Sequence, residues 1–125
     1  MSAGAADRLG GAAPLLPRRV YSQAVVRHIF LWNVRRDVGS DASQRIIDAL
    51  NMLRAEPVPA RGWTLGADVP PAGSEDSGGR WEFGLVSDYD SWEQLQAYYS
   101  TDEHAALVGK IVPLIADRAV CDFEV

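Results

Sequence analysis

Residues 23–34 constrain the fold most, because they must form a strand that is covered on both sides. The segment is rich in β-branched and aromatic residues and contains neither glycine nor proline, which predicts a β-strand. Alternate residues of a strand point to opposite faces, so one face carries Val26, His28, Phe30 and Trp32, and the other carries Val25, Arg27, Ile29 and Leu31. Both faces are largely apolar. Helices on one side of a sheet would leave the second face uncovered, and we therefore expect dimerisation through the sheet.

The rest of the chain predicts two more strands, a closing strand and intervening helices. A helix is predicted to begin at Asp41, which stands three residues before a glutamine as in a capping box, and to end before Pro57. Strands are predicted at 62–69 and 80–88, separated by a loop at 70–79.

A second helical region follows the third predicted strand. Asp90 or Ser91 is expected to cap a helix that continues from Trp92 to Tyr99. After a polar turn, a further helix carries apolar residues at helical spacing, and Pro113 shortens or bends it. Residues 119–125 alternate as a last strand, with Cys121, Phe123 and Val125 on one face.

This order, β-α-β-β-α-β, predicts the α+β ferredoxin-like fold with a four-stranded antiparallel sheet. We expect one domain over residues 23–125, preceded by a flexible leader at 1–22. Helices should cover one face of the sheet. By strand alternation we expect the other face to be an aromatic patch of His28, Phe30, Trp32, Trp81 and Phe83. Two such sheets packed face to face would bury the patch and could leave cavities between them.

Composition excludes several classes of function. A net charge of −5, a pI near 4.9 and the lack of a basic stripe argue against binding nucleic acid or an anionic membrane. No apolar run approaches the roughly 18 residues that span a bilayer, so we expect a soluble cytoplasmic protein. The single cysteine, Cys121, has no partner for an intrachain disulfide and is expected to be a small buried side chain.

Four stretches of the chain together resemble the stress-responsive dimeric A/B-barrel (Dabb) family. They are VVRHIFLWNV, GWTLGADV, FGLVSDYDSWEQLQAYYSTDEHAALVGKIVPLI and the terminal VCDFEV. The family's marks are a first strand with a central histidine, a helix ending in tyrosine, a histidine-containing turn and a last strand with an Asp-Tyr/Phe pair. The likeness covers residues 24–125, and it implies a homodimer whose two sheets form an α+β barrel.

Functions in the family are heterogeneous and include a plant polyketide cyclase, a plant hydroxynitrile lyase and heat-stable stress proteins. The cyclase's acid-base residues match His28, Tyr98 and His104 here. The first histidine and the proline of the cyclase's His-Pro turn are replaced here by Thr101 and Asp102. Two polar pocket residues of the cyclase, a tyrosine and a histidine, match positions that carry apolar residues here, Leu50 and Phe83. The resemblance thus implies a retained acid-base core in a more apolar pocket.

On this basis His104 is predicted to be the general base, with Tyr98 and His28 stabilising or orienting a substrate oxygen. The cavity is expected to be shaped by Phe30, Trp32, Leu50, Trp81 and Phe83. The plainer interpretation is that Tyr98 and His104 pack a helix-turn-helix and that His28 is a hydrogen-bonded core residue. We expect no metal, because three consecutive residues such as Asp102, Glu103 and His104 do not converge easily on one ion, and no cofactor.

The leading hypothesis is a cofactor-independent enzyme of polyketide-cyclase or lyase type, which acts on a small, largely apolar carbonyl compound. One alternative is a non-catalytic stress-response or ligand-carrier dimer, and another is a cofactorless monooxygenase. An enclosed pocket shared by Tyr98 and His104 would favour catalysis. A cavity filled by tryptophans, with His104 facing solvent, would favour the non-catalytic alternative.

Overall fold

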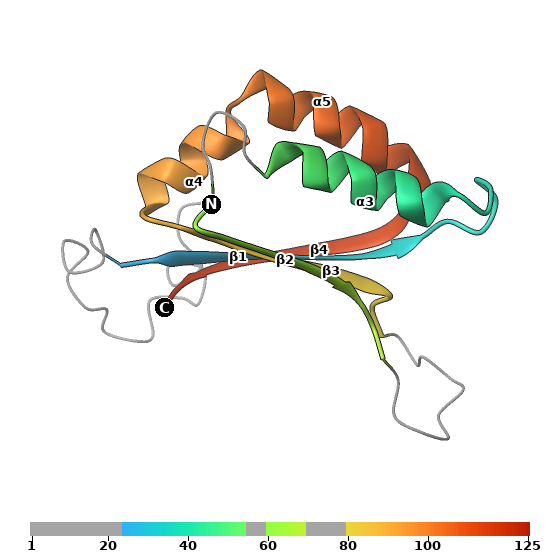
Figure 1. Cartoon of the computed structure of the whole chain (residues 1–125), viewed down its shortest axis with the longest axis horizontal. Helices are drawn as coiled ribbons and strands as arrows, with labels where there is room; N and C mark the ends of the chain where they lie inside the picture. Colours follow the sequence, from blue (N-terminus) through green and yellow to red (C-terminus); the bar gives the residue numbers. More distant parts are fainter. Residues whose placement is uncertain (1–23, 55–59, 70–79) are drawn as a thin grey trace, which may run out of the picture.

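An antiparallel sheet forms one layer of the molecule, and helices packed on one of its faces form the other (Figure 1). The computed structural model describes residues 24–54, 60–69 and 80–125, and within these the sheet has four strands in the order β2-β3-β1-β4. The strands are β1 (Val26–Val34), β2 (Gly62–Ala67), β3 (Phe83–Tyr89) and β4 (Ile115–Glu124). The helices are α3 (Ala42–Leu53), α4 (Trp92–Tyr99) and α5 (Asp102–Ile111).

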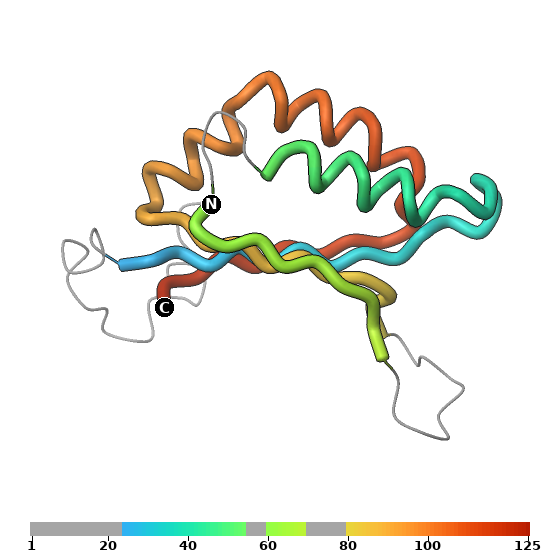
Figure 2. Tube along the Cα trace, in the orientation of Figure 1, coloured from blue at the N-terminus to red at the C-terminus, as the bar shows by residue number. Residues whose placement is uncertain are grey.

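These elements confirm the predicted α+β ferredoxin-like fold, since β1-α3-β2-β3, a helical pair and β4 follow one another along the chain. The C-terminal strand β4 runs beside the first strand β1 (Figure 2). Strand β1 is an inner strand of the sheet, because it also pairs with β3. The predicted leader at 1–22, the prolines at 57 and 59 and the loop at 70–79 lie outside the described residues. No helix in the described part of the chain is long and apolar enough to cross a membrane.

Helix boundaries follow from capping residues and from Pro113. The Ser91 hydroxyl accepts a hydrogen bond from the Gln94 amide at 3.2 Å and so caps α4. Asp41 stands at the N-cap of α3, but its side chain makes no capping hydrogen bond. Pro113 lies in a 3-10 turn, Val112–Leu114, that ends α5, and extended backbone resumes at Ile115. Strand β4 therefore begins earlier than the predicted position 119.

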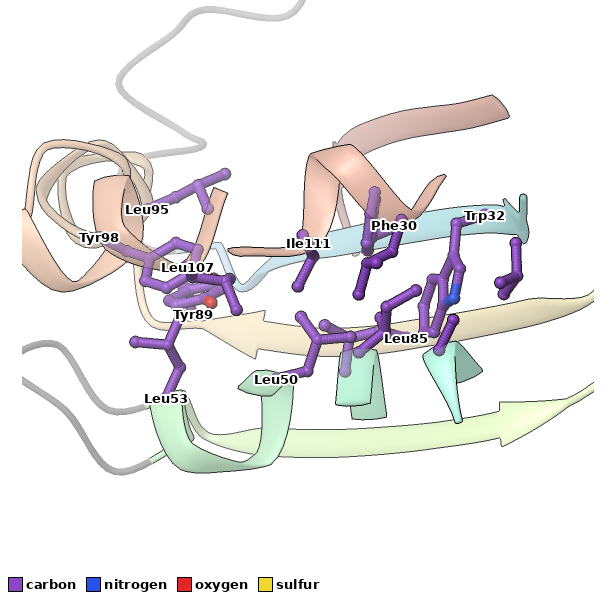
Figure 3. Packing of buried hydrophobic residues seen from close by; sticks show 14 of the residues in the cluster. Phe30, Trp32, Leu50, Leu53, Leu85, Tyr89, Leu95, Tyr98, Leu107 and Ile111 are labelled. Carbon is purple, nitrogen blue, oxygen red and sulfur yellow. The ribbon is translucent and has the colours of Figure 1, made fainter. Parts of the chain in front are cut away.

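The helix-covered face of the sheet carries the core. Alternate residues of β1 are buried beneath the helices: Val26, His28, Phe30, Trp32 and Val34. Figure 3 shows Phe30 and Trp32 packed in the same layer as Leu50, Leu85 and Ile111. The Trp32 ring stacks on Phe30 and on Phe83, with ring centroids 5.0 and 5.5 Å away.

The prediction that these aromatic residues form the uncovered face is therefore wrong. His28, Phe30 and Trp32 lie beneath the helices, and Phe83 packs against the same core. The period of two shows which residues share a face, but it does not show which face the helices cover. The helices cover the face with the bulkier and more uniformly apolar side chains, and leave open the face that includes Arg27 and Asn33.

The open face still carries apolar side chains in neighbouring register positions. Ile29 of β1 lies between Val86 of β3 and Cys121 of β4. Cys121 is exposed in this chain, which corrects the expectation that it is buried. Strand β4 lies at the edge of the sheet, and Cys121 shares its open face with Phe123.

Candidate active site

A cavity of about 300 Å³ lies between the sheet and the helices. Strands β1, β3 and β4 and helices α3, α4 and α5 all contribute to its wall. The lining residues are His28, Phe30, Leu50, Leu85, Tyr98, Tyr99, His104, Leu107, Val108, Ile111, Arg118, Ala119 and Val120. The volume is at the lower end of the range of small-molecule sites, and the lining is mostly apolar with a few polar groups, as such sites usually are.

The polar end of the cavity is built around His28. The antiparallel pairing of β1 with β4 places His28 opposite Asp122, and Nδ1 of His28 lies 2.6 Å from Oδ1 of Asp122. The Tyr99 hydroxyl donates a hydrogen bond to Oδ2 of the same carboxylate at 2.7 Å and lies 3.0 Å from His28 Nδ1. Strand pairing and the end of α4 thus hold three polar side chains in one hydrogen-bonded group.

This hydrogen-bonding pattern fixes the tautomer of a neutral His28. A carboxylate only accepts hydrogen bonds, so Nδ1 carries the proton and donates it to Asp122. Because the Tyr99 hydroxyl donates to Asp122, it faces Nδ1 as an acceptor. The lone pair of the imidazole is then on Nε2, and the Asp122 carboxylate stabilises the positive charge that forms when Nε2 takes up a proton.

Tyr98 and His104 meet at the turn between α4 and α5. Thr101 caps α5, and its hydroxyl accepts a hydrogen bond from the His104 amide at 3.0 Å. This cap places the His104 imidazole edge-on against the Tyr98 ring, with centroids 4.8 Å apart. Within the described residues the Tyr98 hydroxyl has no hydrogen-bond partner, although the Tyr98 side chain is buried and lines the cavity.

Burial sets the protonation of both side chains. Desolvation raises the pKa of Tyr98, so the phenol stays protonated at neutral pH and is a hydrogen-bond donor. Desolvation, with a smaller contribution from nearby His28, lowers the pKa of His104. His104 is therefore a neutral imidazole at neutral pH. Burial and the hydrogen bond to Asp122 likewise raise the pKa of Tyr99.

The structure brings together the three residues predicted to be catalytic, since His28, Tyr98 and His104 all line this cavity. Phe30 and Leu50 line it as well. Trp32, Trp81 and Phe83 do not: Trp32 stacks on Phe83 away from Tyr98 (Figure 3), and Trp81 precedes β3. No tryptophan fills the described cavity, and His104 is half-buried against it, which is the arrangement that favours a ligand site.

Sequence reasoning missed Tyr99 and Asp122. The sequence predicts Tyr99 only as the last residue of a helix, and this prediction gives its hydroxyl no role. Asp122 belongs to the Asp-Tyr/Phe pair of the last strand, and this pair predicts no partner for its carboxylate. Alternation in the last strand already separates Asp122 from Cys121 and Phe123. It does not show that Asp122 lies opposite His28, because that contact joins residues 94 positions apart.

The family model described as the stress responsive A/B barrel domain (Dabb) matches residues 26–125. The search of curated proteins found no significant match. A dimeric ferredoxin-like protein of unknown function from Thermobifida fusca is 28% identical and has a TM-score of 0.69, over 84% of this chain and 94% of that one.

An enzyme and a provisionally assigned enzyme have the same fold but lower sequence identity to this chain. The hydroxynitrile lyase from Passiflora edulis is 17% identical, with a TM-score of 0.73 over 82% of this chain and 94% of the lyase. A Caulobacter crescentus protein, provisionally assigned as an antibiotic biosynthesis monooxygenase, is 14% identical, with a TM-score of 0.63 over 86% and 95% of the two chains. These likenesses support the fold and do not extend to the reaction.

Proposed function

The chain belongs to the stress-responsive A/B-barrel (Dabb) family, and from this membership and the geometry of the cavity we propose that it is a cofactor-independent acid-base enzyme. Its substrate would be a largely apolar carbonyl compound, as in a polyketide cyclase or a related lyase. The observation that carries the proposal is the Asp122–His28–Tyr99 group at the end of an apolar cavity, beside a Tyr98 hydroxyl without a protein partner among the described residues.

The reaction begins with removal of a proton from the carbon next to the carbonyl group. Nε2 of His28 takes the proton, and the electron pair of the C–H bond moves to the carbonyl oxygen to give an enolate. Asp122 stabilises the imidazolium through Nδ1, as the carboxylate of a catalytic triad does. The enolate carbon attacks a second carbonyl of the same chain, and the new alkoxide recovers the proton from the imidazolium.

Tyr98 provides the complementary donor. Its protonated phenol donates a hydrogen bond to the enolate oxygen, where negative charge develops in the transition state. His104, which the sequence predicts to be the general base, lies against the same phenol and is kept as the alternative to His28. The geometry favours His28, because in the described part of the chain Asp122 bonds to His28 and not to His104.

Proton abstraction is testable without the natural substrate. Phenylacetone is an apolar ketone with an acidic C–H bond, and its exchange in D₂O is followed by proton NMR. We expect the wild-type protein to accelerate exchange well above the His28→Ala His104→Ala double variant. Equal rates for the two proteins would overturn the acid-base proposal and favour the ligand-carrier alternative.

The same groups could also remove a hydroxyl proton, which is the first requirement for cleaving a cyanohydrin. The likeness to the Passiflora edulis lyase is a likeness of fold, so this reaction is a second candidate. Release of benzaldehyde from mandelonitrile, followed by ultraviolet absorbance, distinguishes it. Cleavage without ketone exchange would assign the protein to the lyase type.

We also propose that the protein forms a homodimer through the open face of the sheet. Related structures from Thermobifida fusca and Bacteroides fragilis are described as dimeric. The open face presents Ile29, Val86 and Phe123, and an apolar surface of this kind favours an interface.

A further inference from the structure

Arg118 is the one permanently cationic side chain among the described residues that line the cavity. It lies on the edge strand β4 and is exposed. The other titratable lining residues, which are the two histidines and the two tyrosines, all lie at the polar end with Asp122. Arg118 therefore adds a permanent positive charge to the site, which none of these residues provides.

The register of the sheet places Arg118 away from the acid-base group. Strand β4 pairs Asp122 with His28, Val120 with Phe30 and Arg118 with Trp32. Arg118 and Asp122 share the helix-covered face and are separated by about 13 Å along the strand, at roughly 3.3 Å per residue. Val120 and Phe30 form an apolar stretch between the two polar positions.

Solvent exposure shows that the cavity opens beside β4. The lining residues of the sheet centre and of α3 are buried: His28 is 5% exposed and Leu50 is 2% exposed. Val120 is 54% exposed, and its neighbour Arg118 is exposed as well. Arg118 therefore lies on the solvent-exposed side of the cavity, whereas His28 lies at its buried end.

The positive charge of Arg118 is not neutralised within the described part of the chain. Most described arginines form ion pairs there, including Arg27 with Asp88 and Arg80 with Asp68, whereas Arg118 forms none. Its sequence neighbour Asp117 points to the other face of the sheet. Arg45 is another described arginine without an ion pair, but it lies on the outer surface of α3 and lines no described cavity.

We propose that the cavity selects carbonyl compounds that carry a carboxylate at the far end of an apolar chain. The carboxylate pairs with Arg118 at the mouth, the chain lies along Phe30 and Val120, and the reacting carbonyl reaches His28. Guanidinium groups bind carboxylates in a two-point geometry, which makes Arg118 a specificity-determining residue for a medium-chain oxo acid. The reaction assigned to His28 rests on the proposed function, whereas the binding of the carboxylate does not.

Calorimetric titration with octanoate and octanamide tests the inference, because the two probes differ in charge and share their chain. We expect the wild-type protein to bind octanoate about fivefold more tightly than octanamide, as for an exposed ion pair. The Arg118→Ala variant should bind both equally, while Arg45→Ala, which removes the same charge from α3, should behave as wild type. Hexanoate should bind more weakly than octanoate by about fourfold per missing methylene.

The results separate this inference from the proposed function. The His28→Ala variant should retain the octanoate preference, since His28 is not needed to hold the carboxylate. A preference for octanoate without any ketone exchange would support the acid-binding site and refute the reaction. Failure of octanoate to bind, or unchanged octanoate affinity in Arg118→Ala, would overturn the role of Arg118 whatever the exchange assay shows.

Discussion

Nδ1 of His28 donates a hydrogen bond to Asp122 across the β1–β4 pair, over a distance of 2.6 Å. Neither residue would be functionally distinctive by itself, since a histidine in a strand interior is commonly a hydrogen-bonded core residue. The carboxylate fixes the tautomer of the imidazole and stabilises its protonated form. This pair is therefore the reason to propose His28 as a base and not only as a structural histidine of the core.

Replacing Asp122 by asparagine should impair the base without removing it. Asparagine keeps the shape of the side chain but loses the charge that stabilises the imidazolium. General bases contribute roughly 10²–10⁴-fold to rates. We therefore expect the ketone exchange rate of Asp122→Asn, measured by NMR, to be at least about tenfold lower than that of wild type.

Asp117→Asn is the matched control, because Asp117 is an exposed aspartate of the same strand on the opposite face. It should exchange phenylacetone as wild type does. If Asp122→Asn were as active as this control while His104→Ala were inactive, the base would be His104.

Removing the hydroxyl of Tyr99 should lower the stability of the protein, whereas removing that of the adjacent Tyr98 should lower its exchange rate. Tyr99→Phe removes a hydroxyl that donates to the Asp122 carboxylate at 2.7 Å, and hydrogen bonds to charged groups contribute about 1.5–3 kcal/mol. We expect a loss of roughly 1.5 kcal/mol or more in the free energy of unfolding, measured by urea titration.

Tyr98→Phe should affect catalysis and not stability, because the Tyr98 hydroxyl has no hydrogen-bond partner among the described residues. Its unfolding free energy should change little, while its exchange rate should fall with the loss of the donor to the enolate. Equal destabilisation by the two substitutions would mean that Tyr98 has a structural hydrogen bond and is not held free for a ligand.

Most of the fold could be predicted from local patterns. The segment that became β1, the Ser91 cap and the helix-ending Pro113 are all readable from neighbouring residues. The covered face of the sheet was not readable, because alternation is symmetric and both faces of β1 are largely apolar. That choice depends on the whole core, including the stacking of Trp32 on Phe30 and on Phe83.

In the candidate site, too, contacts between residues close in the sequence were predictable, and contacts that depend on strand register were not. Tyr98 and His104 lie close in the sequence, and the turn capped by Thr101 brings them together, so their proximity was predictable. The contact of His28 with Asp122 depends on strand register, which no short pattern specifies. Arg118 was not singled out either, since its place at the cavity mouth follows from the same register.

Acid should destabilise the protein in part through His104. Its pKa is lowered in the folded protein by burial, so the unfolded chain binds the proton more readily. Stability is complete above the usual value of 6.5 and falls as the pH drops through the lowered folded pKa. The urea midpoint of wild type should therefore decrease more between pH 7.5 and 5.5 than that of His104→Gln.

Asp88 loses its contribution in a lower pH range than His104. Hydrogen bonding to Arg27 lowers the pKa of Asp88, so that its contribution is present above the usual value of 3.8 and is lost only at lower pH. It therefore does not disturb the comparison between pH 7.5 and 5.5. Identical decreases for wild type and His104→Gln would show that His104 is not desolvated in the folded protein.

A charge on the open face of the sheet should dissociate the proposed homodimer. Ile29 lies in the central strand β1 between Val86 and Cys121, so Ile29→Glu would bury a carboxylate without a partner if two open faces pack together. We expect the mass measured by analytical ultracentrifugation to fall from that of a dimer to that of a monomer.

Met52→Glu is the control, because Met52 is 71% exposed on α3, on the other side of the sheet, and this variant should stay dimeric. An unchanged dimer in Ile29→Glu would place the interface elsewhere, while a monomeric wild-type protein would refute the homodimer itself.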